Sequence, residues 1–163
     1  VTSRYHIWLP VTEFVQGDIF FLRSNPETTI TGPASAYAPI SVGGFNASDD
    51  SLYLDSGRGY NIDNQVKRDF LAPAVEVFGP DLTGNFTRRT GTSAAAAVTA
   101  GAAAQLLEWG VVRGNSSDMN NALIKNYLLV GTDKTPGRVY PNPEEGYGRL
   151  NVYKAFTNMR RTT

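Results

Sequence analysis

The feature that most restricts the possible folds of this chain is a run of alanines that follows a Gly-Thr-Ser sequence. From Ser93 to about Trp109, small residues give way to Leu106 and Leu107, a spacing that predicts one long helix. Alanine has the highest helix propensity, and its small side chain lets neighbouring backbones approach closely. We therefore expect a helix that is buried in the centre of the protein.

The first turn of this helix differs in kind from the rest. Gly91, Thr92 and Ser93 place hydroxyl groups where unpaired backbone N–H groups and the positive end of the helix dipole meet. Developing negative charge is stabilised there, as a serine nucleophile requires during acyl transfer. The alternative is a hydroxyl that merely caps the helix, which is the usual role of a serine before an arbitrary helix.

The composition is that of a globular chain without a strongly charged partner. The 163 residues are 41% apolar, and 15 basic side chains balance 15 acidic ones. This neutral balance argues against a nucleic-acid partner. There is no cysteine, which excludes disulfides and thiolate chemistry. We expect no cofactor. We also expect no apolar run to approach the length needed to cross a membrane.

Two acidic pairs are candidate metal ligands. Asp49–Asp50 and Glu144–Glu145 lie among Gly, Pro and Asn residues, which favour turns. We interpret both pairs as solvated turns instead of metal ligands, and the sequence therefore predicts no metal site.

The first half of the chain predicts strands. Strand-like patterns cover residues 5–9, 18–22 and 39–45, and residues 66–79 supply at least one more strand. The long helix that follows changes the period of the pattern. A mixed α and β protein is expected.

Two shorter helices are expected in the second half. One covers residues 116–131, with Ser116 or Ser117 as its cap and Gly131 at its end. Asn151 is expected to cap a short final helix.

Motifs on both sides of Ser93 support its interpretation as a nucleophile. Upstream, residues 37–50 contain Val-Gly-Gly, residues 55–59 read Asp-Ser-Gly-Arg-Gly, and residues 70–77 contain Ala-Pro-Ala. Downstream, residues 146–156 follow the pattern Gly-x-Gly-x-Leu-Asn-x-x-x-Ala. In this order, together with Gly-Thr-Ser-x-Ala, the motifs resemble those of the subtilisin family of serine proteases.

The resemblance extends from about Thr28 to about Phe156, with some departures from the family pattern. Ala97 and Val98 stand where a Pro-His pair is common, and Ala74 replaces a glycine. None of these departures concerns the nucleophile. The competing Gly-x-Ser-x-Gly motif of α/β-hydrolases is not met, because an alanine follows at the second glycine position.

The resemblance implies an α/β fold, namely the C-terminal part of a doubly wound, mostly parallel sheet with flanking helices. The alanine-rich motif and the segments before it are similar to the Csp branch of germination proteases, in which a jelly-roll domain is inserted upstream of the serine segment. On this basis residues 1–19 are the end of a jelly-roll-like β domain with a linker. Residues 20–163 are the C-terminal part of the catalytic domain.

The family's other catalytic residues have no clear counterpart in this chain. A subtilase triad needs an aspartate and a histidine beside the serine. His6 is the single histidine and lacks the flanking residues of the family motif, and Asn25 does not match the oxyanion asparagine. Of the oxyanion hole, the Ser93 N–H remains, supported by Gly91 and Thr92. The aspartates of the first half are expected to be surface or turn residues: Asp18, Asp49, Asp50, Asp55, Asp63 and Asp69.

Three functions remain open. The first is a serine endopeptidase segment in which Ser93 is the nucleophile, completed by an upstream part that carries Asp, His and the oxyanion Asn. The second is a non-catalytic subtilase relative that binds or signals, and the third is a self-contained structural domain. The resemblance implies a protein or peptide substrate, such as the precursor of a cortex-degrading enzyme, and an extracytoplasmic or spore-associated location. Self-association through exposed sheet edges is also expected.

Overall fold

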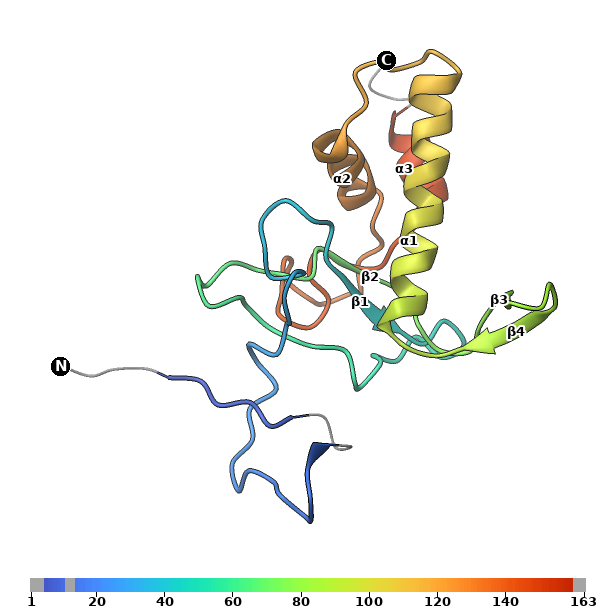
Figure 1. Cartoon of the computed structure of the whole chain (residues 1–163). Helices are drawn as coiled ribbons and strands as arrows, with labels where there is room; N and C mark the ends of the chain where they lie inside the picture. The colour runs from blue at the N-terminus through green and yellow to red at the C-terminus, as the bar shows by residue number, and fades with distance from the viewer. Residues whose placement is uncertain (1–4, 11–13, 160–163) are drawn as a thin grey trace.

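Two short parallel strands and a long helix form the centre of the molecule. The computed structural model describes residues 5–10 and 14–159 (Figure 1). Strand β1 (Val42–Phe45) pairs in parallel with β2 (Phe70–Pro73), and helix α1 (Thr92–Leu107) packs against both. This arrangement of parallel strands beneath a helix is an α/β fold.

A further segment extends the parallel pair at the free edge of β2. The N–H of Leu71 donates to the carbonyl of Gly148 over 2.8 Å, and the N–H of Leu150 donates to the carbonyl of Leu71 over 2.7 Å. Arg149 in turn exchanges two backbone hydrogen bonds with Asp133. The Gly-x-Gly-x-Leu motif thus lies beside β2. The described strands do not by themselves amount to a doubly wound sheet.

Helix α1, which the sequence predicts to be buried, is buried along one face. Its buried residues are Ala95, Thr99, Ala102 and Leu106, spaced so that they share one face. That face packs against β1 and β2. The opposite face is exposed and consists of small residues: Ala96, Ala97, Ala100, Gly101 and Ala104.

The same helix is long and apolar. Together with the π-helix η2 (Glu108–Val112) it forms a continuous helical run, Thr92–Val112, with a mean hydropathy of 1.3. By length and composition alone, this run could cross a membrane. This corrects the expectation that no apolar run reaches that length. Because one face of α1 packs against strands, the run is accounted for by the core of an α/β fold.

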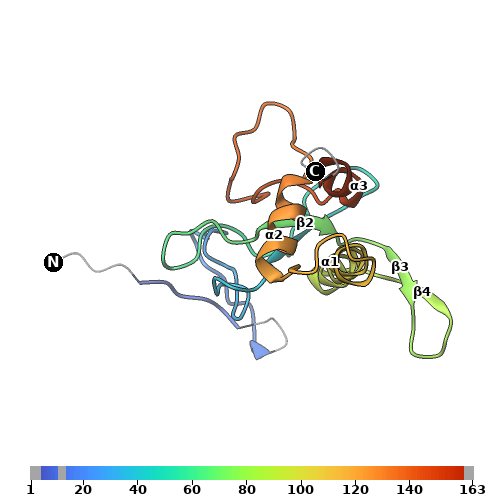
Figure 2. The same ribbon diagram turned by 90° about the horizontal axis from the view of Figure 1, so that it is seen from above.

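Two shorter helices pack together beyond α1 (Figures 1 and 2). Helix α2 spans Asn121–Val130 and α3 spans Val152–Met159. A Cβ added to Gly131 would lie 2.6 Å from the Cβ of Ala155, so only glycine permits this approach. The main apolar core joins α1, α2 and α3 through Phe70, Ala102, Leu106, Met119, Ile124, Leu128 and Met159.

The caps of these helices were partly predicted. Asn151 caps α3, since its Oδ1 accepts a hydrogen bond from the N–H of Lys154 over 2.9 Å, and Gly131 ends α2. The predicted start of α2 was wrong: Asn120 caps it, instead of Ser116 or Ser117. The residues from 116 to 120 form a turn instead of a first helical turn.

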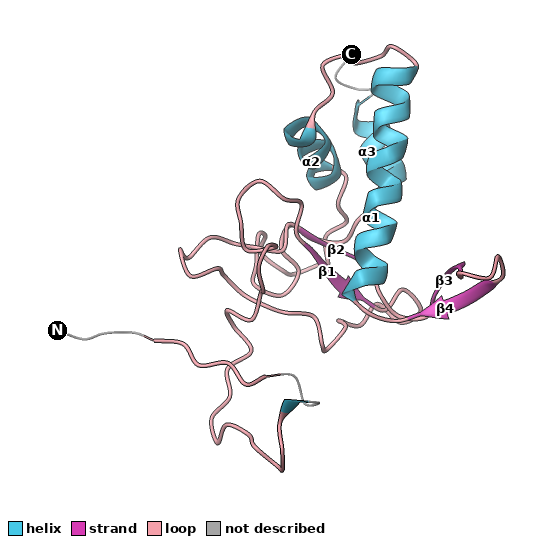
Figure 3. Cartoon of the chain, in the orientation of Figure 1, coloured by secondary structure: helices cyan, strands magenta, loops and turns pink. Residues whose placement is uncertain are grey.

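An antiparallel hairpin projects from the base of α1 (Figure 3). Strands β3 (Val77–Pro80) and β4 (Phe86–Arg89) pair, and the rings of Phe78 and Phe86 stack with centroids 5.2 Å apart. Residues 66–79 therefore contain both β2 and the first strand of this hairpin. The sequence patterns did not reveal β4.

The predicted strands at residues 5–9 and 18–22 do not form. Both segments are irregular, although the indole N–H of Trp8 donates to the carbonyl of Thr28 over 3.0 Å. A strand requires a partner for its backbone hydrogen bonds, and the described part of the chain provides none for either segment. The prediction for residues 39–45 is confirmed for the part that forms β1.

Candidate functional site

The start of α1 is held against the end of β2 by a glycine in an unusual conformation. Gly91 is the N-cap, with φ of 143° and ψ of 162°, values that favour glycine. Its N–H donates to the carbonyl of Ala74 over 2.8 Å. This contact fixes where the first turn of the helix begins.

Small side chains allow the helix to come this close to the strands. Ala72, Ala74 and Ala95 form a fully buried cluster between β2 and α1. On the other side of the cluster, a Cβ added to Gly44 would lie 2.5 Å from the Cβ of Ala74. The alanines and glycines around the helix start are thus required by close packing.

Ser93 lies at the second residue of α1, exposed at the end of the helix where backbone N–H groups are free. The N–H groups of Ala94 and Ala95 both donate to the carbonyl of Gly91, at 3.0 and 3.4 Å. Within residues 5–10 and 14–159, the N–H groups of Thr92 and Ser93 have no acceptor, and the Ser93 hydroxyl has no hydrogen-bond partner. Two N–H donors without an acceptor and the hydroxyl of an exposed serine therefore lie at the positive end of a helix dipole, an arrangement suited to an oxyanion.

The single histidine does not belong to this site. His6 is exposed and stacks on Trp8, with ring centroids 5.6 Å apart. It lines a cavity together with Tyr5, Thr28 and Tyr60. Figures 1 and 2 show the N-terminal segment well away from the first turn of α1.

The candidate aspartates also have other partners. Asp49 accepts from the N–H of Ser51, and Asp50 pairs with Arg149 over 2.8 Å, so this acidic pair does lie in a turn. Asp69 departs from the surface or turn position expected of it. It is buried and pairs with Lys125 over 2.8 Å.

For the second acidic pair, Glu144–Glu145, the prediction of a solvated turn is wrong for Glu145. Glu145 is 1% exposed, and its carboxylate accepts a hydrogen bond from the Thr135 hydroxyl over 3.1 Å and another from the Tyr140 hydroxyl. Arg138 and Arg149 lie 3.6 and 3.8 Å away. This carboxylate is buried because distant residues supply its partners, which its Gly- and Pro-rich surroundings in the sequence do not reveal. Among the residues that the structure describes, no group of three potential ligands could hold a metal ion.

A buried arginine, Arg68, lies just before β2. Burial lowers the pKa of Arg68 to about 10, helped by the nearby positive charge of Arg58. Its guanidinium donates to the carbonyls of Pro143 and Glu144, at 3.5 and 2.9 Å. These contacts attach the loop before the Gly-x-Gly motif to β2.

Comparison with known proteins identifies relatives for most of the chain. A family model described as the subtilase family matches residues 17–148. The structure of the CspB protease of Clostridium perfringens matches with a TM-score of 0.80 and 33% identity, over 85% of this chain and 30% of that chain. No match was found among the curated proteins.

Two maturation proteases have a similar fold. The prenylagaramide maturation protease PagA matches with a TM-score of 0.63 and 28% identity, over 77% of this chain and 44% of that chain. The patellamide maturation protease PatA matches with a TM-score of 0.61 and 28% identity, over 79% and 46% of the respective chains. The present chain thus spans less than half the length of each of these proteins.

Proposed function

Because the chain belongs to the subtilase family, we propose that it supplies the nucleophile of a serine endopeptidase through Ser93. One observation carries the proposal: Ser93 is exposed in the first turn of α1, next to two backbone N–H groups that have no acceptor in the described chain. A serine that merely capped the helix would stand at its N-cap position, but that position is Gly91, and no side chain forms a cap hydrogen bond there. Gly91 and Thr92 support the site as part of the same turn.

The reaction proposed is the hydrolysis of a peptide bond through an acyl-enzyme. Ser93 Oγ attacks the carbonyl carbon, and its proton passes to a histidine. The carbonyl oxygen becomes an oxyanion, to which the Ser93 N–H donates a hydrogen bond. The C–N bond then breaks, the leaving amine takes the proton from the histidine, and water releases the acid product from Ser93.

The histidine, its orienting aspartate and the oxyanion asparagine are proposed to lie in an upstream part of the same protease. The length of the relatives supports this, since the chain spans 30% of the CspB protease. In the same proposal, residues 1–19 end an inserted jelly-roll-like domain, and residues 20–163 are the C-terminal part of a doubly wound catalytic domain.

The exposed face of α1 is the surface on which the upstream part is proposed to dock. Ala97, Ala100 and Ala104 succeed one another along this face in the direction away from Ser93. Such small side chains permit a second layer of structure to approach the helix backbone. A docked upstream part would cover the helix and bring its histidine towards the first turn.

The test is active-site labelling with a fluorophosphonate probe. The chain is labelled alone and after mixing with the upstream part of its protein, and Ser93→Ala is compared with Ser117→Ala, which removes an exposed serine elsewhere. We expect labelling in the mixture, retained in Ser117→Ala and lost in Ser93→Ala. Labelling of the chain alone would show that a base is present within it.

A non-catalytic subtilase relative is the second candidate. The observation in its favour is that, within the described residues, no titratable side chain forms a hydrogen bond with the Ser93 hydroxyl. If neither the chain nor the mixture is labelled, this candidate replaces the first. The chain would then serve as a binding or signalling component.

A further inference from the structure

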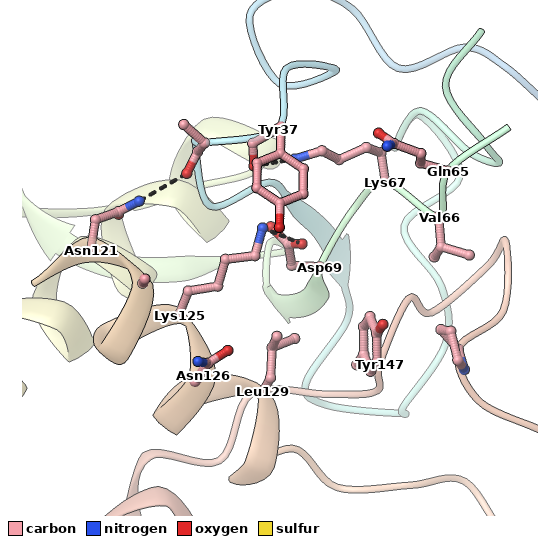
Figure 4. A pocket seen from close by; sticks show the side chains of 13 residues that line it. Tyr37, Gln65, Val66, Lys67, Asp69, Asn121, Lys125, Asn126, Leu129 and Tyr147 are labelled. Atoms are coloured by element: carbon pink, nitrogen blue, oxygen red, sulfur yellow. Dashed lines mark hydrogen bonds and ion pairs between the residues drawn. The ribbon is translucent and has the colours of Figure 1, made fainter. Parts of the chain in front are cut away.

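A cavity of about 640 Å³ lies on the side of the molecule formed by the beginning of α2 and the residues that lead into β2 (Figure 4). Tyr37 and Tyr147 contribute aromatic walls. In the view of Figure 4, the ring of Tyr37 lies between the side chains of Lys67 and Lys125. The cavity is distinct from the Ser93 site, none of whose residues line it.

Lys67 brings a positive charge into this cavity without an acidic partner. The residue is 3% exposed. Its ammonium donates to the carbonyls of Tyr37 and Pro39 over 3.3 and 3.4 Å, both long for hydrogen bonds. Within the described ranges, no carboxylate lies within 4.0 Å of this ammonium. A buried charge of this kind is costly until an opposite charge approaches it.

The carboxylate in the cavity wall forms its ion pair with Lys125 and not with Lys67. Asp69 binds the ammonium of Lys125 over 2.8 Å and accepts from the N–H of Ser41 over 2.7 Å. Burial lowers the pKa of Lys67, the negative charge of Asp69 raises it in part, and the like charge of Lys125 has a smaller lowering effect. Two ammonium groups and one carboxylate leave the cavity with an excess of positive charge.

The remaining wall favours an organic anion over a mineral one. Gln65 and Asn126 offer side-chain amides, while Val66 and Leu129 are apolar. A phosphate would be better served by arginines or by a cluster of backbone N–H groups. A carboxylate attached to an apolar body matches both halves of the lining.

We propose that this cavity binds a small ligand with one carboxylate and an apolar body, with the carboxylate facing Lys67. The C-terminal residue of a peptide and a free acyl amino acid share this chemistry. The proposal does not depend on catalysis by Ser93. The carboxylate of the ligand would form the ion pair that Lys67 lacks within the described chain.

The test is calorimetric titration of the intact protein with N-acetyl-leucine. N-acetyl-leucinamide has the same apolar body without the charge, inorganic phosphate has charge without the body, and N-acetyl-alanyl-leucine represents a peptide end. We expect saturable binding of N-acetyl-leucine and binding about tenfold or more weaker for the amide, as for the loss of a hydrogen bond to a charged group. Tighter binding of the dipeptide would identify a peptide end as the ligand, and equal binding a free acid.

Three variants locate the binding. Lys67→Met is expected to weaken it about tenfold or more, whereas Arg113→Met, which removes an exposed positive charge elsewhere, leaves it unchanged. Ala122→Trp fills the cavity from the exposed start of α2 and is expected to abolish binding. This second variant tests the site independently if Lys67→Met does not fold. The proposal is overturned if the amide binds as well as the acid, if phosphate alone binds, if Ala122→Trp still binds, or if no ligand binds.

Discussion

Gly91 holds a backbone conformation that a residue with a side chain rarely adopts, at the position that starts helix α1. Its φ is 143°, and an added Cβ would meet nothing closer than the Ser93 nitrogen at 3.9 Å. A substitution there would be opposed by the backbone and not by a collision. This separates Gly91 from Gly101, in the middle of the same helix.

Alanine at these two glycines is expected to have opposite effects. Gly91→Ala should lower the free energy of unfolding by about 1–3 kcal/mol, the cost of a strained backbone. Gly101→Ala should raise it by about 0.5–1 kcal/mol, because the position is helical and open. Urea denaturation followed by circular dichroism measures both. A stabilising Gly91→Ala would contradict the conformation described.

Single residues show what the sequence could and could not foretell. Ser93 was singled out by a local motif, and its position in the first turn of a helix follows from neighbours in the sequence. Asp69 and Glu145 were expected to be exposed, yet both are buried. Their partners, such as Lys125 for Asp69, come from distant parts of the chain, so the local composition could not reveal them.

At the level of elements, the beginning of α2 separates the sequence-based expectation from the structure. The side chain of Asn120 accepts hydrogen bonds from the N–H groups of Ala122 and Leu123, at 3.0 and 3.2 Å. Asn120→Ala should therefore cost about 1 kcal/mol of stability. Ser117→Ala should change it by less than about 0.5 kcal/mol, because Ser117 is exposed and does not cap the helix. Thermal unfolding of the two variants decides between the caps, and a larger loss in Ser117→Ala would favour the earlier start.

Helices were predicted better than strands, for a physical reason. A helix satisfies its own backbone, so the periodicity from Ser93 to Trp109 and the cap at Asn151 suffice to place one. A strand depends on a neighbour, and residues 18–22 have strand-like composition but no partner strand in the described chain. The hairpin strand β4 is not evident from the sequence because its four residues, which are mostly exposed, show no alternation of apolar and polar side chains.

For the whole molecule, the exposed apolar surface is expected to govern how the chain behaves in solution. Besides the alanine face of α1, Phe14, Phe20 and Leu22 are more than two-thirds exposed, at 81%, 71% and 92%. Monomeric soluble proteins rarely expose large contiguous apolar patches. The chain on its own is therefore expected to bind hydrophobic dyes and to self-associate as its concentration rises.

Sedimentation velocity with two variants of α1 tests this expectation. Ala100→Glu places a charge on the exposed face and should weaken self-association by about tenfold while the helix content is kept. Ala102→Glu places the same charge on the buried face and should unfold the chain. A chain that stays monomeric and stably folded at every concentration would instead support a self-contained structural domain.

The hydrogen bond between the N–H of Gly91 and the carbonyl of Ala74 brings together two points of the chain that enclose the whole β3–β4 hairpin. The position of Ser93 is thus set by the sheet and not by what lies between these points. Residues 75–90 can change in length or sequence over evolution at a small entropic cost, without moving the serine. The hairpin is accordingly a place where an engineer could graft a foreign loop beside an unchanged helix start.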